Sequence, residues 1–293
     1  MDKCMYITDE QANLLTIRDP MVVVLGDTYY LTGTQPPYWE GVNDGVHLWS
    51  SKDLEHFTDH GLILKRADMP EDMWCRDGFW ASELFDGGDG WFYLTFNCRN
   101  YKTGFEQSCG LARAREITGP YEIMTKDQPL LKGANDATLF RDDDGTLYLA
   151  CNRSNPLRLE LHRLDPSTGT VSDGELVCMT GTPDEWDHVG VEGQCICKHH
   201  GIYFQWYSSW TDTTYAAGYM TAPSIHGPWK KFPGNPVLAE NDSYYVPGHN
   251  HTFRGLDGKD YITFHAQARN EQFLERFYIR PVEYRADGTV EIL

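Results

Sequence analysis

One hairpin recurs five times along the 293-residue chain, and this repeat constrains the fold more than any other feature. Each copy has a turn glycine with a tyrosine two or three residues later. Successive glycines lie 64, 55, 56 and 57 residues apart, at Gly26, Gly90, Gly145, Gly201 and Gly258. A period of roughly 40–60 residues built from short strands is typical of a β-propeller. The sequence therefore predicts an all-β fold, a single five-bladed β-propeller.

The repeat runs from near residue 17 to the end of the chain, and no linker rich in proline, glycine or serine interrupts it. We therefore expect one domain over residues 1–293. Its blades are expected at approximately 17–64, 80–131, 136–179, 192–238 and 249–293. A propeller must close its ring to avoid exposed strand edges, so residues 1–16 are expected to supply a strand to the last blade.

An acidic residue or a histidine stands ahead of each turn, with spacings of 64, 53, 56 and 57, at Asp19, Glu83, Asp136, Glu192 and His249. The first strand of each propeller blade lines the central channel, so these side chains should converge there. Each acid alone could serve a structural salt bridge, and Asp19 before Pro20 could be a turn residue. Because unpaired buried carboxylates are costly, a ring of them indicates a chemical site.

Several carboxylates around a narrow opening suit glycoside hydrolysis. That reaction needs one carboxylic acid that protonates the leaving oxygen. It also needs one carboxylate that activates water or attacks the sugar. A third carboxylate nearby would raise the pKa of the acid by like-charge repulsion and keep it protonated near neutrality.

Short motifs around these residues resemble glycoside hydrolase family 43 in order and spacing over nearly the whole chain. The motifs are Arg18-Asp19-Pro20, Trp80-Ala81-Ser82-Glu83, Asn135-Asp136-Ala137-Thr138-Leu139-Phe140, Val191-Glu192-Gly193, Gly248-His249-Asn250-His251, Thr263-Phe264-His265-Ala266 and Arg276–Val282. The resemblance implies that Asp19 is the general base, that Asp136 tunes the pKa of the acid, and that Glu192 is the general acid. Three prolines usual in the family are replaced by Ser82, Ala137 and Gln194, which leaves subfamily and substrate open.

The resemblance further implies an inverting hydrolase acting on a small pentose-containing oligosaccharide, of the α-L-arabinofuranosidase or β-xylosidase type. Arg276 would contact a sugar hydroxyl, and Glu83 would face either the channel or a neighbouring arginine. No cofactor is required, but His249 resembles a channel histidine that commonly touches calcium through waters. His251 points to the same strand face. Aromatic residues that could stack on a sugar ring are Trp74, Phe79, Trp80, Trp206 and Trp210.

The formal net charge of −18 argues against nucleic acid or an anionic membrane as partner. No apolar stretch is long enough for a membrane span, and the first residues carry no secretory signal. We therefore expect a cytoplasmic protein, or a secreted one if a signal has been removed; oligomeric state stays open. The eight cysteines contain no CxxC pair and are expected to be reduced core residues. Cys195 and Cys197, followed by His199-His200, do not match common zinc spacings.

Two other classes of function remain open. A retaining fructosidase-like propeller also carries Arg-Asp-Pro, but after an Asn-Asp-Pro-Asn nucleophile motif, whereas here Arg18-Asp19-Pro20 comes first. A carbohydrate-binding propeller without catalysis would not need all three acids. A protein-binding propeller would leave them with no evident purpose.

Overall fold

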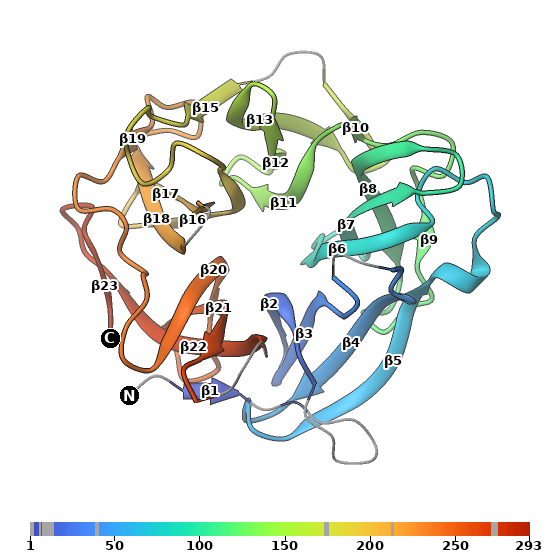
Figure 1. Cartoon of the computed structure of the whole chain (residues 1–293), viewed down its shortest axis with the longest axis horizontal. Helices are drawn as coiled ribbons and strands as arrows, with labels where there is room; N and C mark the ends of the chain where they lie inside the picture. The colour runs from blue at the N-terminus through green and yellow to red at the C-terminus, as the bar shows by residue number, and fades with distance from the viewer. Residues whose placement is uncertain are drawn as a thin grey trace.

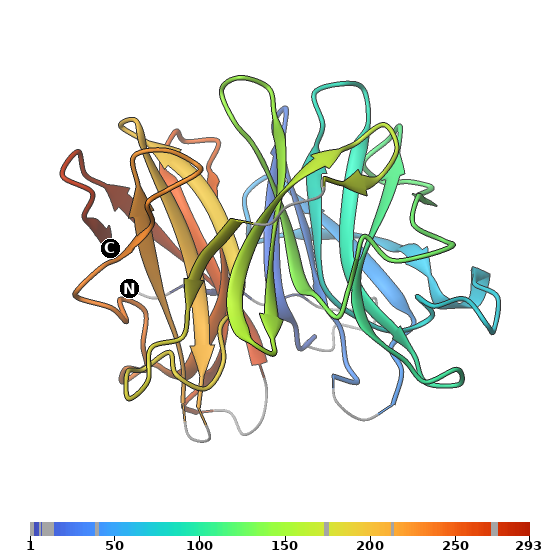
Figure 2. The same cartoon turned by 90° about the horizontal axis from the view of Figure 1, so that it is seen from above.

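The computed structural model describes residues 3–5, 7, 15–38, 41–172, 176–211, 214–270 and 275–293. Five antiparallel sheets stand like blades around a central channel, which confirms the predicted five-bladed propeller (Figure 1). Seen from the side, strands run through the thickness of the ring, with loops at both faces (Figure 2). The described helical structure is one 3-10 turn, η1 (Arg66–Asp68), and no described helix is long and apolar enough to span a membrane.

Each blade is built outward from its first strand. Blade one contains β2 (Arg18–Leu25), β3 (Thr28–Thr34), β4 (Gly45–Ser51) and β5 (Phe57–Lys65). Blade two contains β6 (Asp77–Asp86), β7 (Phe92–Asn100), β8 (Phe105–Ala114), β9 (Glu122–Ile123) and β10 (Leu131–Lys132). Blade three contains β11 (Asn135–Arg141), β12 (Leu147–Ser154), β13 (Leu157–Asp165), β14 (Thr170–Val171) and β15 (Leu176–Thr180).

Blades four and five follow the same order. Blade four contains β16 (Glu192–His199), β17 (Ile202–Trp210), β18 (Tyr215–Ala222) and β19 (Lys230–Lys231). Blade five contains β20 (Tyr244–Arg254), β21 (Asp260–Ala268), β22 (Glu275–Tyr284), β23 (Val290–Ile292) and the N-terminal strand β1 (Lys3–Met5).

The N-terminal strand closes the ring, as predicted. In the pairing of β1 with β22, Lys3 lies opposite Ile279 and Met5 lies opposite Phe277. The first and last strands of the chain, β1 and β23, therefore belong to the same blade (Figure 1). Tyr6 and residues 8–14 of the expected closing segment lie outside the described residues.

The apolar core is divided among the interfaces between neighbouring blades. Because side chains alternate along a strand, Leu48 packs against blade two while its neighbour Trp49 packs against blade five. In the same way, Tyr148 faces blade four and Leu149 faces blade two. This arrangement leaves the centre of the ring to the first strands and their polar side chains.

Seven of the eight cysteines are described with their side chains; these seven are free thiols, and all but Cys197 are buried. Cys195 and Cys197 lie inside β16. The Cys197 thiol donates to the Tyr284 hydroxyl at 3.3 Å, and the His199 ring stacks on the Tyr284 ring with centroids 3.8 Å apart. These residues therefore form a strand interior followed by a turn.

Candidate active site

Each first strand carries a bulge near its start, where the pairing with the second strand shifts register. One residue in every bulge has a left-handed backbone. These residues are Asp19 (φ 52), Ala81 (φ 44), Asp136 (φ 50), Gly193 (φ 60) and His249 (φ 46). A left-handed backbone costs roughly 1–2 kcal/mol for a residue other than glycine, and such strain concentrates at functional sites. The five bulges therefore mark the structural repeat of the site.

The bulges show that the five residues predicted to be equivalent do not all occupy the same position in their strands. Asp19, Asp136 and His249 occupy equivalent left-handed positions, but Glu192 precedes its left-handed residue by one position. Glu83 follows Ala81 by two positions and lines a separate cavity of about 340 Å³ at the opposite end of the first strands. In β6 the left-handed position equivalent to Asp19, Asp136 and His249 is occupied by Ala81, so Glu83 lies two residues further along the strand.

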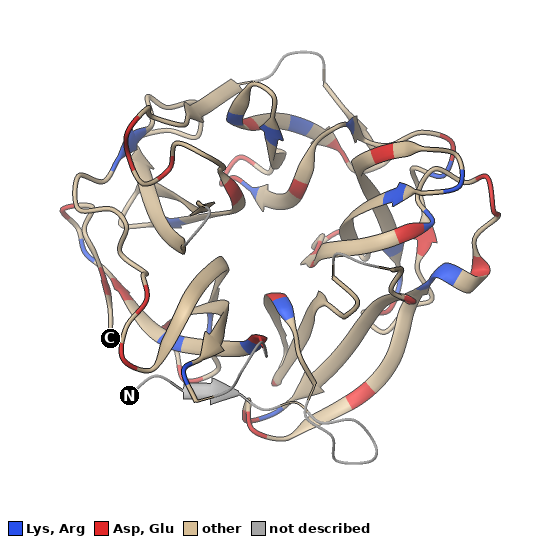
Figure 3. Cartoon of the chain, in the orientation of Figure 1, with Lys and Arg blue, Asp and Glu red and all other residues tan. Residues whose placement is uncertain are grey.

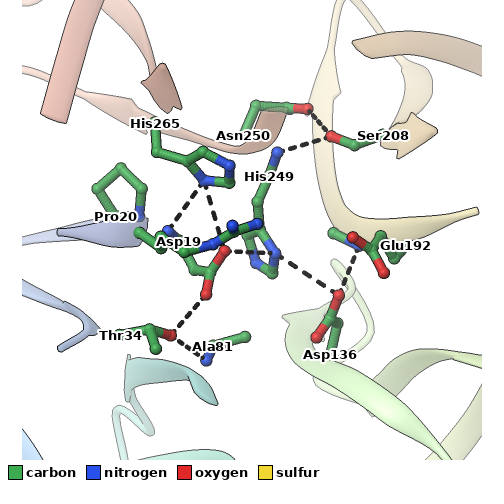
Figure 4. Close-up of polar contacts among 12 residues, drawn as sticks. Asp19, Pro20, Thr34, Ala81, Asp136, Glu192, Ser208, His249, Asn250 and His265 are labelled. Atoms are coloured by element: carbon green, nitrogen blue, oxygen red, sulfur yellow. Dashed lines mark hydrogen bonds and ion pairs between the residues drawn. The ribbon is translucent and has the colours of Figure 1, made fainter. Parts of the chain in front are cut away.

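A ring of hydrogen bonds holds the five bulges in place (Figure 4). Every left-handed residue donates its backbone N–H to a side chain from the preceding blade. The pairs are Asp19 to His265 Nδ1 (3.2 Å), Ala81 to Thr34 Oγ1 (2.8 Å), Asp136 to Asn97 Oδ1 (2.9 Å), Gly193 to Asp136 Oδ2 (2.9 Å) and His249 to Ser208 Oγ (2.8 Å). Each first strand is thus positioned by the blade before it.

His249 lies between two of the predicted catalytic carboxylates. Its Nδ1 is 3.3 Å from Asp19 Oδ1 and 3.5 Å from Asp136 Oδ2 (Figure 4). Burial lowers the pKa of His249, but the surrounding carboxylates, with Asp19 and Asp136 foremost, outweigh burial and raise it above the ordinary value. A protonated His249 therefore places a positive charge between the two acids.

Asp19 and Asp136 respond in opposite ways to this environment. Burial favours a raised pKa for Asp19, but the charges of His249 and Arg18 outweigh it and hold the pKa of Asp19 below the ordinary value. Thr34 also donates to Asp19 Oδ2 at 2.5 Å. Burial raises the pKa of Asp136 to about 7, with the charge of His249 opposing the shift and that of Glu192 adding to it. Asp19 is thus suited to act as an ionised base.

Glu192 is held by a residue that the sequence did not single out. The Tyr215 hydroxyl donates to Glu192 Oε1 at 2.6 Å, and burial raises the pKa of Tyr215 well above its ordinary value, so the phenol stays a donor. The Tyr215 ring stacks on His265 with centroids 5.5 Å apart. A Cβ at Gly248 would lie 1.6 Å from the ring. Gly248 thus makes the space that Tyr215 occupies.

Two connected cavities meet at Glu192. The inner pocket has a volume of about 300 Å³ and is lined by Asp19, Asp136, Glu192 and His249. The outer cavity has a volume of about 1330 Å³. The two share four lining residues, Arg18, Gln107, Asn135 and Glu192. Acidic segments on β2, β11 and β16 border the channel in Figure 3.

Only two of the predicted stacking aromatics line these cavities. Trp80 lines the inner pocket and Trp210, 41% exposed, lines the outer one. The predictions for Trp74, Phe79 and Trp206 were wrong, because all three rings are buried in the interfaces between blades. Local sequence could not separate these cases, since strand aromatics serve both purposes.

Arg276 is not brought into the site. Its side chain is 1% exposed, and its Nη1 donates to the Leu15 carbonyl oxygen at 3.0 Å, so the predicted sugar contact is contradicted. Arg18 occupies the pocket wall instead, with Nη1 3.0 Å from Glu275 Oε1. Burial raises the pKa of Glu275 to about 7, with the charge of Arg18 opposing the shift. The position of Arg18 directly before Asp19 in the Arg18-Asp19-Pro20 motif was the sequence feature that could have identified it as a pocket residue.

The donor set at His249 is a poor match for the calcium suggested by the resemblance. Calcium prefers six to eight oxygen ligands. Both oxygens of Asp136 already accept hydrogen bonds, from Asn97 Nδ2 at 2.8 Å and from the Gly193 N–H at 2.9 Å. His249 Nδ1 faces carboxylates that it can itself neutralise. Calcium therefore stays a prediction, and no step of the chemistry considered below requires it.

The family model described as glycosyl hydrolases family 43 matches residues 15–290. A β-D-galactofuranosidase of Aspergillus niger is 29% identical over 252 residues, which cover 76% of this chain and 66% of that protein. An extracellular exo-α-(1→5)-L-arabinofuranosidase of Cellvibrio japonicus is 22% identical over 330 residues, which cover 96% of this chain and 87% of that protein. The chain spans about half the length of other curated relatives that it matches, with shares of 47% and 46%.

Solved structures show the same architecture. An endo-1,4-β-xylanase from Bacteroides thetaiotaomicron superimposes with a TM-score of 0.82 at 26% identity, covering 95% of this chain and 94% of that one. A thermostable family-43 glycoside hydrolase gives a TM-score of 0.81 at 25% identity, covering 94% and 92%. The relatives therefore share the fold but differ in the substrates that their names state.

Proposed function

The chain belongs to glycosyl hydrolases family 43; from this premise we propose that it is a glycoside hydrolase that removes terminal arabinofuranosyl or xylosyl units with inversion at the anomeric carbon. The observation that carries the proposal is the position of Glu192 where the inner pocket meets the outer cavity. The inner volume of about 300 Å³ lies at the lower end of the range for small-molecule sites, which favours one bound sugar unit.

The reaction follows from the charges of the site. Asp19, ionised by its neighbours, takes a proton from a water molecule, and the water oxygen forms a bond to the anomeric carbon. Glu192 gives its proton to the glycosidic oxygen as the bond from that oxygen to the anomeric carbon breaks. An inverting pair requires the two carboxyl groups to stand roughly 6.5–9.5 Å apart, so that the water fits between base and sugar. Asp136 fixes the Gly193 N–H next to the acid.

The substrate class is supported by the names of relatives, which include an arabinofuranosidase and a xylanase. The A. niger relative is named for a galactofuranoside, a hexose in the same furanose ring form as arabinofuranose. A panel of chromogenic arabinosides, xylosides and galactofuranosides therefore tests the proposal directly, with the anomer of the first product followed by NMR.

The decisive variant is Glu192→Ala. It should abolish hydrolysis of natural glycosides but spare dinitrophenyl glycosides, whose leaving group needs little protonation. Glu240→Ala is the matched control, because the Glu240 side chain is 56% exposed and pairs with Arg269, away from both cavities. A retained anomer would point to a fructosidase-like mechanism. Binding of sugars without turnover would point to a carbohydrate-binding propeller.

A further inference from the structure

Three basic side chains line part of the outer cavity, which adjoins the inner pocket at Glu192. They are Lys132 on β10, Arg153 on β12 and Arg158 on β13. Basic segments gather along blade three near β13 in Figure 3. Because a general acid protonates the leaving oxygen, the space beyond Glu192 takes the leaving group. This placement rests on the proposed function.

A buried carboxylate fixes the two arginines. Glu160 has a fully buried side chain, and its Oε1 lies 2.5 Å from Arg158 Nε while its Oε2 lies 3.1 Å from Arg153 Nε. Arg153 Nη1 also donates to the Lys132 carbonyl oxygen. Burying an ion pair is costly and is weak evidence for stability. Glu160 takes no part in the contacts described above among the predicted catalytic residues. Its contacts instead hold the guanidinium groups of Arg153 and Arg158 at the wall of the outer cavity.

A metal site is a weaker explanation for the same cluster. Cys151, Glu160 and His162 offer ligand atoms within 4.8 Å of one another, the one such group among the described residues. Both Glu160 oxygens, however, already accept from guanidinium groups, and Oε2 also lies 3.0 Å from His162 Nε2. Two arginines beside the same carboxylate oppose a cation there.

The positive charge of these three side chains is opposite in sign to the net charge of the whole chain. A net charge of −18 disfavours anionic substrates in general. The lining of the outer cavity nevertheless includes Lys132 from blade two and Arg153 and Arg158 from two paired strands of blade three, although Glu106, Glu192 and Glu275 line it as well. The Arg153 and Arg158 side chains are 19% and 23% exposed, so they are partly shielded from water. The planar guanidinium fork matches the geometry of a carboxylate.

We propose that the outer cavity binds a hexuronic acid residue of the leaving group, with Arg153, Arg158 and Lys132 receiving its carboxylate. The substrate class is thereby narrowed to acidic glycans, in which a neutral terminal sugar is removed from a backbone or branch that bears uronic acid. Neutral leaving groups would enter the same cavity without this contact and would bind more weakly.

The test is calorimetric binding to the wild-type protein, which needs no turnover. One pair of probes is digalacturonic acid and uncharged galactobiose; the other is glucuronosyl-xylose and uncharged glucosyl-xylose. We expect an acidic probe to bind about tenfold more tightly than its uncharged analogue, as charge-assisted hydrogen bonds allow. Added salt should reduce the difference. The pair of probes with the larger difference in affinity shows whether the cavity prefers a galacturonic acid backbone or a glucuronic acid branch.

Two variants and a matched control locate the site. Lys132→Gln should weaken binding of the acidic probe about threefold and leave binding of the uncharged probe unchanged. Arg153→Gln should weaken binding of the acidic probe about tenfold. Lys259→Gln is the control for Lys132→Gln, since both lysines are exposed, 70% and 64%, and pair loosely with an acid at 3.6 and 3.4 Å. Because Lys132 lies on the surface, its substitution leaves the fold intact even if Arg153→Gln does not.

Equal binding of charged and uncharged probes in both pairs would overturn the inference, as would an equal effect of Lys259→Gln. Turnover of glycosides combined with equal binding would contradict the acidic leaving group alone. Preferential binding of an acidic probe without turnover of any glycoside would contradict the proposed function and support the anion site.

Discussion

One end of the central channel holds Asp19 beside His249, and the other end holds Glu83 near His251. Both ends therefore contain a buried carboxylate and an imidazole on first strands. They differ in what surrounds the pair. Asp19 faces His249 and Arg18, which lower its pKa, whereas burial raises the pKa of Glu83.

The surroundings explain the difference in charge. The cavity around Glu83 is lined mainly by apolar side chains, Met21, Val23, Leu84, Phe85, Leu139, Phe140 and Ile196. The charges of His251 and His249 oppose the effect of burial on the pKa of Glu83 but do not outweigh it, and burial also lowers the pKa of His251. At the other end, His249 stands between two carboxylates. Charged neighbours therefore favour the ionised form of Asp19, whereas burial in a mainly apolar cavity disfavours the ionised form of Glu83.

The largest expected effect separates the two ends directly. Asp19→Asn removes the base and should lower kcat/KM by about 10³-fold or more on all substrates, including those with good leaving groups. Steady-state rates on a dinitrophenyl glycoside measure this, and azide should restore activity with a product of inverted configuration. Substantial residual activity would show that another group activates the water.

Asp136→Asn comes next, with a loss of about 10²-fold expected in kcat/KM. It should also change the pH dependence of stability. The folded-state pKa of Asp136, about 7, lies above the ordinary value of 3.8. The folded protein therefore loses stability as pH rises from about 4 to 7, by up to about 1.4 kcal/mol per pH unit for this group. Denaturant unfolding of the variant between pH 4 and 7 should give a flatter profile; parallel profiles would contradict the raised pKa.

Tyr215→Phe tests how the acid is positioned. Loss of the hydrogen bond to Glu192 should lower kcat about tenfold for poor leaving groups and leave good ones unchanged. Steady-state rates on both classes of substrate measure this. An equal loss on both classes would indicate a merely structural role.

Glu83→Gln should have the smallest effect on activity, less than about twofold, because Glu83 lines neither of the two cavities that meet at Glu192 and is out of reach of the reacting groups there. Burial raises the pKa of Glu83, so the wild-type protein loses stability as pH rises above the ordinary carboxyl pKa. The Gln variant has no such carboxyl group, so it should become more stable than the wild type as pH rises through this range. Activity and unfolding measured on one preparation check both points. A large loss of turnover would remove the distinction between the two ends.

The repeat of turn glycines was enough to predict the fold, because each glycine ends a first strand and fixes the blade period. Asp19, Asp136 and His249 could be aligned for the same reason. Glu83 could not, because the equivalent position in β6 is held by Ala81, which has no charged side chain that would mark it in the sequence. Glu83 is the first acidic residue after it and lies two positions further along the strand.

Other parts of the site depend on contacts that no local pattern reveals. Tyr215 lies at the start of β18, and its hydroxyl reaches Glu192 only because Gly248 in blade five leaves room for the ring. Phe79 was indistinguishable in sequence from Trp80, because a strand aromatic faces a blade interface or the channel according to the bulge beside it. Trp74 precedes β6 and is buried between blades one and two. Side-chain direction at a bulge is set by register, which is a property of two strands.

The ring of backbone hydrogen bonds also determines when the site can form during synthesis of the chain. The N–H of Asp19 is fixed by His265, a residue made 246 positions later. A nascent chain that has completed four blades already contains Asp19, Asp136 and Glu192, but it lacks both His265 and His249. The catalytic group is therefore assembled only when the last blade emerges, so that an unfinished polypeptide carries the acids without the activity.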